Sequence, residues 1–83
     1  MRPVEFEIDT RSSVPSWRQL ADKLTAAIES GEYAPDDPIP SLRRLHQETG
    51  LAQSTIQHAL KELHERGLTY SVPGRGTFVK AQG

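Results

Sequence analysis

Three glycines divide the middle of this 83-residue chain into segments that each carry the apolar spacing of a helix. Gly31, Gly50 and Gly67 each follow such a segment, at the position where a helix commonly ends in a left-handed residue. Apolar residues every three or four positions give each segment one face for a core. We therefore expect three helices around one small hydrophobic core, because a chain of this length buries too little surface to form a second core.

The first helix is expected to begin at Ser16, with Ser16 and Gln19 forming a capping box, and Ser41 is expected to cap the second. The third should run from Gln53 to about Arg66. The predicted buried faces consist of Trp17, Leu20, Ala21, Leu24 and Ile28 in the first helix, Leu42 and Leu45 in the second, and Ile56, Ala59, Leu60 and Leu63 in the third.

Strands are expected at both ends of the chain. Alternating Val4, Phe6 and Ile8 predict a short leading strand, which should pair with the hairpin or with a second chain. Residues 68–72 and 77–80 predict a hairpin around a type II turn at Pro73-Gly74, and the proline-rich residues 33–40 a rigid extended connector. The fold class is thus α+β: a winged helix-turn-helix in one domain, residues 1–83, with its core at about 15–80.

Composition excludes several classes of protein. Without cysteine the chain has no disulfide framework and no thiolate metal site, and it shows neither a signal peptide nor an apolar stretch of membrane-spanning length. His46, His58 and His64 lie on different helices or helix faces, so we expect no zinc site. No catalytic constellation or cofactor motif is recognisable. The sequence therefore predicts a cytoplasmic protein that is not an enzyme and holds no cofactor.

The net charge of −1 conceals a polarity along the chain. Residues 1–40 carry a net charge of −4, whereas residues 41–83 carry +3. A basic half can mark a side that faces a polyanion. The helix, glycine turn and helix at 41–66 are an arrangement that places a second helix in the major groove of DNA.

The candidate DNA-binding residues lie on the second and third helices and on the hairpin turn. Polar side chains on the third helix would meet base edges, arginines on the second helix would bind phosphates, and an arginine between two glycines would enter the minor groove. The candidates are Ser41, Arg43, Arg44, Gln53, Ser54, Thr55, Gln57, His58, Lys61, Arg75, Gly76 and Thr77. Each group also has a simpler interpretation. The third helix can present an ordinary solvated polar face, the two arginines can offset Glu48 and the acidic first half of the chain, and the glycine-flanked arginine can lie in a turn that binds nothing.

Six segments of the chain form a recognisable pattern: Pro-Ser-Trp-Arg-Gln-Leu at 15–20, Ile-Glu-Ser-Gly at 28–31, Ile-Pro-Ser-Leu-Arg-Arg-Leu at 39–45, Thr-Ile-Gln-His-Ala-Leu at 55–60, Leu-His-Glu-Arg-Gly-Leu at 63–68 and Gly-Arg-Gly-Thr-Phe-Val at 74–79. Together, over about Pro15 to Val79, they resemble the N-terminal domain of the GntR family of bacterial transcriptional regulators. The resemblance implies a winged helix that binds DNA. It matches the family at Arg43, Thr55 and Arg75.

The chain departs from the family pattern at three places. The connector has Pro35-Asp36 instead of Pro-Gly, Leu42 replaces a glutamate, and Ala52-Gln53 replaces the Ser-Arg that opens the recognition helix. A further family arginine is Gln57, so weaker phosphate binding and a different base preference are expected. Losing the serine cap at 52 should cost about 1 kcal/mol unless Ser54 replaces it, with Gln57 as its partner in a capping box.

The function that the resemblance implies is a sequence-specific transcriptional regulator, by analogy a repressor. Its recognition helix would be about 53–66 and its wing 73–76. The expected partner is double-stranded DNA with a palindromic or direct-repeat operator, bound by a homodimer. Related chains continue into a ligand-sensing domain, so a fragment and a stand-alone form are both open, and no effector site is visible. The alternative is a winged helix used for protein contacts.

Overall fold

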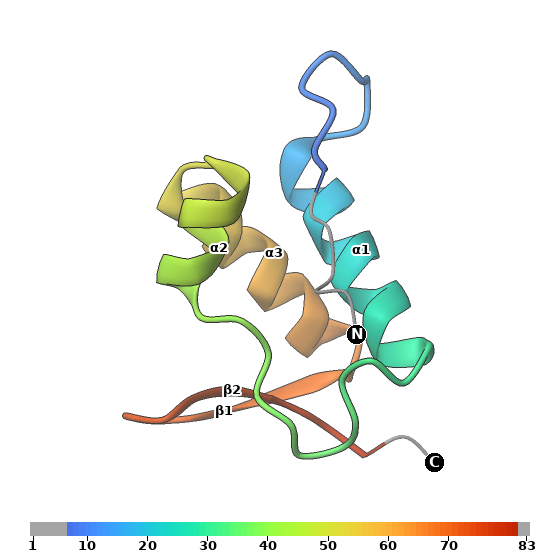
Figure 1. The fold of residues 1–83 in the computed structure, drawn as a ribbon, viewed down its shortest axis with the longest axis vertical. Helices are drawn as coiled ribbons and strands as arrows, with labels where there is room; N and C mark the ends of the chain where they lie inside the picture. The colour runs from blue at the N-terminus through green and yellow to red at the C-terminus, as the bar shows by residue number, and fades with distance from the viewer. Residues whose placement is uncertain (1–6, 82–83) are drawn as a thin grey trace.

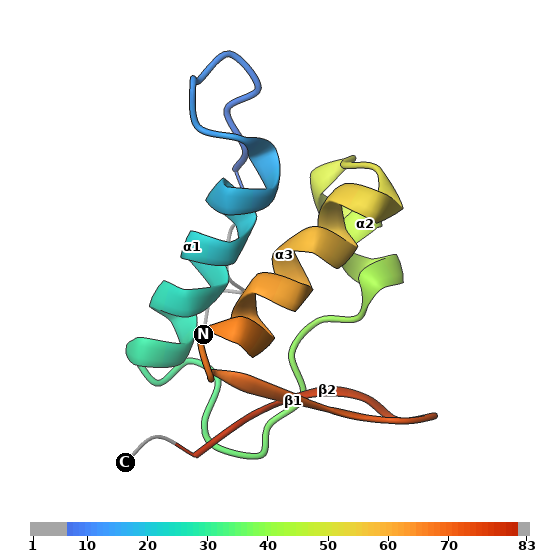
Figure 2. The ribbon, with the colours of Figure 1, turned by 180° about the vertical axis from the view of Figure 1, so that it is seen from behind.

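The computed structural model describes residues 7–81, and in that range three helices precede a two-stranded antiparallel hairpin (Figure 1). The elements are α1 (Ser16–Glu29), α2 (Leu42–Thr49), α3 (Gln53–Glu65), β1 (Thr69–Val72) and β2 (Gly76–Val79). Seen from behind, α3 runs diagonally between α1 and α2, with the hairpin below all three (Figure 2). This order confirms the predicted winged helix-turn-helix.

The core lies where α1, α2 and α3 meet the base of the hairpin. Its largest fully buried side chains come from every part of that junction: Leu20, Leu24, Leu45, Ile56, Leu63 and Val79. Trp17, Leu42 and Leu60, which were expected in the core, are half-buried at its edge. The predicted apolar stripes are therefore confirmed, with these three side chains at the edge of the core.

The helix ends differ in how their free backbone groups are satisfied. At α2 the Ser41 hydroxyl accepts a hydrogen bond from the Arg44 N–H at 3.2 Å, as predicted. At α3 the N-cap is Ala52, which offers no side-chain acceptor, and Ser54 does not replace it. Gly50 and Gly67 follow α2 and α3 in the left-handed conformation, with φ of 73° and 77°.

The predicted capping box at the start of α1 is wrong. The N-cap is Pro15, without a side-chain hydrogen bond, and Gln19 bonds elsewhere. Its Nε2 donates to the carbonyls of Asp9 and Val14 at 2.8 Å, and its Oε1 accepts from the Asp9 N–H at 2.8 Å. The amide therefore fastens the preceding segment to α1, because a glutamine can donate and accept at once.

The predicted leading strand over Val4 to Ile8 lies mostly outside the described residues. Of its three apolar residues only Ile8 is described, and it packs against the core. Glu7 to Asp9 form no strand, and this segment is held by Gln19.

The connector between α1 and α2 runs along the hairpin before it reaches α2 (Figure 1). The Asp36 N–H donates to the Val79 carbonyl at 2.7 Å, the Val79 N–H to the Asp37 carbonyl at 2.9 Å, and the Ile39 N–H to the Thr77 carbonyl at 3.0 Å. The connector thus pairs with β2 and covers one edge of the hairpin. The connector is extended around Pro38, where it pairs with β2, as expected. It is not extended throughout: it turns at Pro35-Asp36, where the Asp37 N–H donates to the Ala34 carbonyl at 3.0 Å. Neither this turn nor the pairing was predicted.

The hairpin turn has the geometry predicted for Pro73-Gly74. The Arg75 N–H donates to the Val72 carbonyl at 2.9 Å, and Gly74 has a φ of 77°, which a type II turn requires at its third residue. The strands pair in register from Thr69 with Val79 to Val72 with Gly76.

Arg66, just after α3, links this helix to α1. Its Nε donates to Glu62 at 2.9 Å, its Nη2 to Asp22 at 3.0 Å and its Nη1 to the Thr25 hydroxyl at 3.0 Å. The hydrogen bond to Glu62, together with that to Asp22, raises the pKa of the Arg66 guanidinium. One charged group thereby holds two carboxylates on neighbouring helices.

Removing this link should weaken the packing of α1 against α3. We expect Arg66→Met, which keeps most of the stem, to lower the free energy of unfolding by about 1 kcal/mol, since partly exposed ion pairs contribute modestly. Urea denaturation at low salt measures the change, and 1 M salt should reduce it. Arg18→Met, an exposed replacement on α1, is the control. An unchanged midpoint for Arg66→Met would contradict the linking role.

A side-chain cap should stabilise α3. Ala52→Ser places a hydroxyl at a residue whose φ of −60° and ψ of 149° suit an N-cap, so we expect a gain of about 1 kcal/mol. For a domain of this size that raises the melting temperature by roughly 4–8 °C. Ala81→Ser, beyond the last strand, should leave it unchanged. Equal melting temperatures for Ala52→Ser and the parent would show that another group already satisfies the helix start.

Candidate nucleic-acid interface

The face of α3 opposite the core is exposed and polar. Ile56, Ala59 and Leu63 are buried on one side of the helix, so positions spaced around the other side face solvent. The exposed residues on α3 include Gln53, Ser54, Gln57, His58 and Lys61. Thr55 is half-buried at the margin of this face. The third helix therefore presents the predicted candidates together on one surface.

His58 differs from the other candidates because its ring already has a partner. It stacks on Trp17 of α1, with ring centroids 4.0 Å apart and planes inclined by 14°. Such stacking holds an aromatic ring in one orientation. His58 consequently marks the α1 side of the exposed face, and Ser54, Gln57 and Lys61 lie on its open part.

The turn between α2 and α3 is held by two side chains that the sequence analysis did not select. His46 Nδ1 lies 2.6 Å from the Leu51 carbonyl and therefore donates to it. The Thr49 hydroxyl donates to the Leu45 carbonyl at 2.7 Å and accepts from the Leu51 N–H at 3.1 Å. These hydrogen bonds fix the orientation of α3 relative to α2. No periodicity signals them, because they depend on the shape of the turn.

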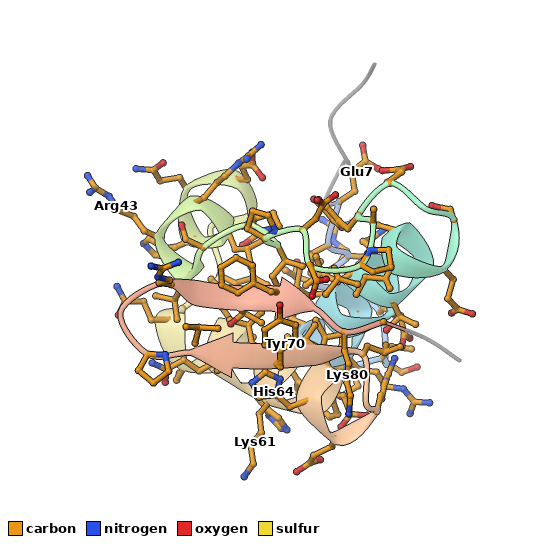
Figure 3. All side chains as sticks on the ribbon, turned by 90° about the horizontal axis from the view of Figure 1, so that it is seen from below. Glu7, Arg43, Lys61, His64, Tyr70 and Lys80 are labelled. Carbon is orange, nitrogen blue, oxygen red and sulfur yellow. The ribbon has the colours of Figure 1, made fainter. Side chains whose placement is uncertain are left out.

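The two arginines at the start of α2 are in different states. Arg44 donates from Nε to Glu48 at 3.2 Å, although its side chain is 57% exposed, so a carboxylate already offsets its charge. Arg43 forms no ion pair with any residue of the described range 7–81. It points away from the fold, on the side toward which the hairpin tip extends (Figure 3). Arg43 is thus the better placed of the two to bind a phosphate.

The tip of the hairpin carries the third candidate group. Arg75 and Gly76 are exposed and Thr77 is half-buried, with the Thr77 carbonyl bonded to the connector. The tip extends below α2 and away from α1 in both ribbon views (Figures 1 and 2). Lys61 projects on the opposite side of the hairpin from Arg43 (Figure 3). Cationic side chains therefore lie on both sides of the hairpin and at its tip.

Other kinds of site find no support in the part of the chain that the structure describes. Residues 7–81 contain no group of three histidine, cysteine, aspartate or glutamate side chains that could hold a metal ion. The three histidines have separate partners: the turn for His46, Trp17 for His58 and β1 for His64. Within the same residues, no helix combines the length and apolar character needed to cross a membrane.

Comparison with known families and proteins gives one consistent match. The sequence model described as "Bacterial regulatory proteins, gntR family" matches residues 17–79. The transcriptional repressor NagR of Bacillus subtilis is 39% identical over 74 residues, which are 89% of this chain and 30% of NagR. The repressor MngR of Escherichia coli, from a mannosyl-D-glycerate transport and metabolism system, is 37% identical over 68 residues, 82% of this chain and 28% of MngR. The chain thus spans less than a third of these relatives.

Solved structures agree with the sequence matches. YtrA from Sulfolobus acidocaldarius, a GntR-family transcription factor, superposes with a TM-score of 0.86 at 32% identity, covering 95% of this chain and 83% of YtrA. The DNA-binding domain of AraR, in complex with its operator ORE1, superposes with a TM-score of 0.78 at 35% identity, covering 87% of this chain and 88% of that domain.

Proposed function

Because the chain belongs to the GntR family of bacterial regulatory proteins, we propose that it is a sequence-specific DNA-binding transcriptional regulator. The observation that carries the proposal is the exposed polar face of α3, flanked by Arg43 on α2 and by Arg75 at the hairpin tip. A helix of this kind fits the major groove, and a hairpin beside it reaches the adjacent minor groove.

Each candidate group has its own task in this arrangement. Arg43, with the amino end of α2 capped by Ser41, binds phosphates, which set the position of the protein but carry no sequence information. Gln57, one helical turn beyond Gln53, reads a base edge. Arg75 enters the minor groove, where a narrow A·T-rich segment attracts a guanidinium group.

The protein is proposed to act as a repressor in the cytoplasm, as one module over residues 1–83. NagR and MngR are named repressors, and the AraR domain is seen on its operator. One winged helix covers only about 600–1,000 Å² of interface, so high specificity calls for two copies on paired half-sites. The proposed partner is therefore a double-stranded operator, palindromic or directly repeated, bound by a homodimer.

Selection of bound sequences from a random duplex pool tests this function. A DNA-binding regulator enriches a defined half-site, and its affinity falls steeply with salt because bound cations release counterions from DNA. Failure to enrich any sequence, with a flat response to salt, would contradict the proposal and favour the alternative of a winged helix used for protein contacts.

Gln57 is expected to be the main base-reading side chain. Its amide presents one donor and one acceptor, which match N6 and N7 of adenine, and such a contact is worth about 1–3 kcal/mol of discrimination. Gln57→Ala should remove the preference at one base pair and leave the salt dependence nearly unchanged. Affinities for duplexes varied at each half-site position, over several salt concentrations, measure both effects.

The exposed Gln47 on α2 offers the matched control for this variant. Gln47→Ala should retain the parent's preference at every position. If Gln57→Ala weakened binding to all duplexes alike, or to none, the base-reading role would pass to Gln53 or His58.

Arg75 is expected to contribute both charge and shape recognition. Arg75→Ala should weaken binding to the preferred duplex and reduce the slope of affinity against salt by about one phosphate contact. Arg75→Lys keeps the charge but not the planar fork, so it should restore the slope and only part of the affinity. Equal affinity of Arg75→Ala and the parent at moderate salt would remove the hairpin from the mechanism.

A further inference from the structure

The ring of His64 bridges the end of α3 and the first strand of the hairpin. Its Nδ1 lies 2.6 Å from the Thr69 hydroxyl oxygen and its Nε2 lies 2.6 Å from the Ser71 hydroxyl oxygen. Thr69 and Ser71 are two positions apart, so both project from the same face of β1. Figure 3 shows His64 beside this strand. Both ring nitrogens are therefore bonded to one strand.

The two strands of the hairpin are attached to the fold in different ways. β2 pairs with the connector through three backbone hydrogen bonds, at Val79 twice and at Thr77. β1 pairs with β2 only, within residues 7–81, so its outer edge has no neighbouring strand. The bonds from His64 hold this outer strand directly to α3.

These hydrogen bonds lie close enough to the turn to influence the position of the hairpin tip. Ser71 pairs with Thr77, and only the pair of Val72 with Gly76 separates it from the turn that carries Arg75. Thr69 lies at the buried base, 5% exposed. His64 therefore holds β1 at its base and again one residue pair before the turn.

The two hydrogen bonds of His64 do not require a particular tautomer of the ring. A neutral imidazole has one donor and one acceptor nitrogen, and a hydroxyl group can take either role. Both hydrogen bonds therefore form in either tautomer of His64. A planar ring bonded at two points also leaves the strand little freedom to rotate about the helix.

We propose that His64 is a positioning residue that sets the orientation of the hairpin relative to α3, and hence the placement of Arg75 beside the base-reading face. The effect of His64 on DNA binding rests on the proposed DNA-binding function. The two hydrogen bonds from His64 to β1, which we call the brace, do not depend on that function. The segment of the chain that reads DNA in the major groove is thereby coupled to the one that enters the minor groove.

The brace is tested first without DNA. In His64→Ala, amide hydrogen exchange across β1 and β2 should accelerate by about tenfold, as expected for the loss of one or two neutral hydrogen bonds, while the buried amides of α1 and α3 keep their protection. His64→Gln, whose amide can donate and accept, should restore much of the protection. Unchanged exchange in the hairpin of His64→Ala would overturn the proposal.

A double-mutant cycle with Arg75→Ala then tests the coupling on the preferred duplex. His64→Ala should lower affinity by about fivefold to tenfold in the parent, and have no further effect when Arg75 is already alanine. Equal losses in both backgrounds would overturn the proposal, because they would mean that His64 touches DNA or acts through overall stability. Gln47→Ala is the control and should behave as the parent in both backgrounds.

Two further measurements cover the cases in which His64→Ala fails to fold or the parent binds no DNA. Ser71→Ala removes the bond nearer the tip at an exposed position, so it should reproduce a smaller effect of the same kind if His64→Ala fails to fold. The absence of any such effect in Ser71→Ala would then overturn the brace. If the parent binds no duplex, the proposed function fails, and the exchange measurement still decides whether His64 holds the hairpin.

Discussion

Burial of one stripe of α3 against α1 is the constraint on which the other features depend. Ile56 and Leu63 are fully buried beside Leu20 and Leu24, and each such side chain contributes about 1.5–3 kcal/mol. A helix of 13 residues is marginal in water by itself, and this one has no side-chain cap. α3 therefore owes its stability to α1, and the same contact turns its polar side chains outward.

The hairpin depends on a connector that is itself under local strain. Asp36 has a φ of 68°. This left-handed backbone conformation is less favourable for a residue with a side chain than for glycine, although aspartate tolerates it better than most residues. The Tyr70 hydroxyl on β1 donates to the Asp36 carboxylate at 2.8 Å, and this bond raises the pKa of Tyr70. Where the family pattern has glycine, this chain thus has a residue whose side chain adds a hydrogen bond to the three backbone hydrogen bonds between connector and hairpin.

Local rules accounted for most of the fold. The helices follow from apolar spacing and from Gly50 and Gly67, and the hairpin turn follows from Pro73-Gly74, because these signals act over a few residues. Gln19 was misread as a capping partner because its bonds reach Asp9, ten positions away. The pairing of the connector with β2 also joins distant segments, and a stretch with three prolines gives no strand signal.

The candidate surface was predictable in its composition but not in the state of its members. Spacing placed the polar side chains on the outer face of α3, and the sequence left open that the arginines of α2 offset Glu48. The structure shows this ion pair for Arg44 alone, and only the structure stacks His58 on Trp17. A side chain that already has a partner in the free protein must lose that contact before it can use the same atoms to bind a ligand. Among residues 7–81, Gln57 and Arg43 have no side-chain partner of this kind, so binding to a nucleic acid would break no contact within the protein. By that criterion Gln57 outranks His58 and Arg43 outranks Arg44, in agreement with the sequence, which had singled out Gln57 for base reading and Arg43 as a match to the family.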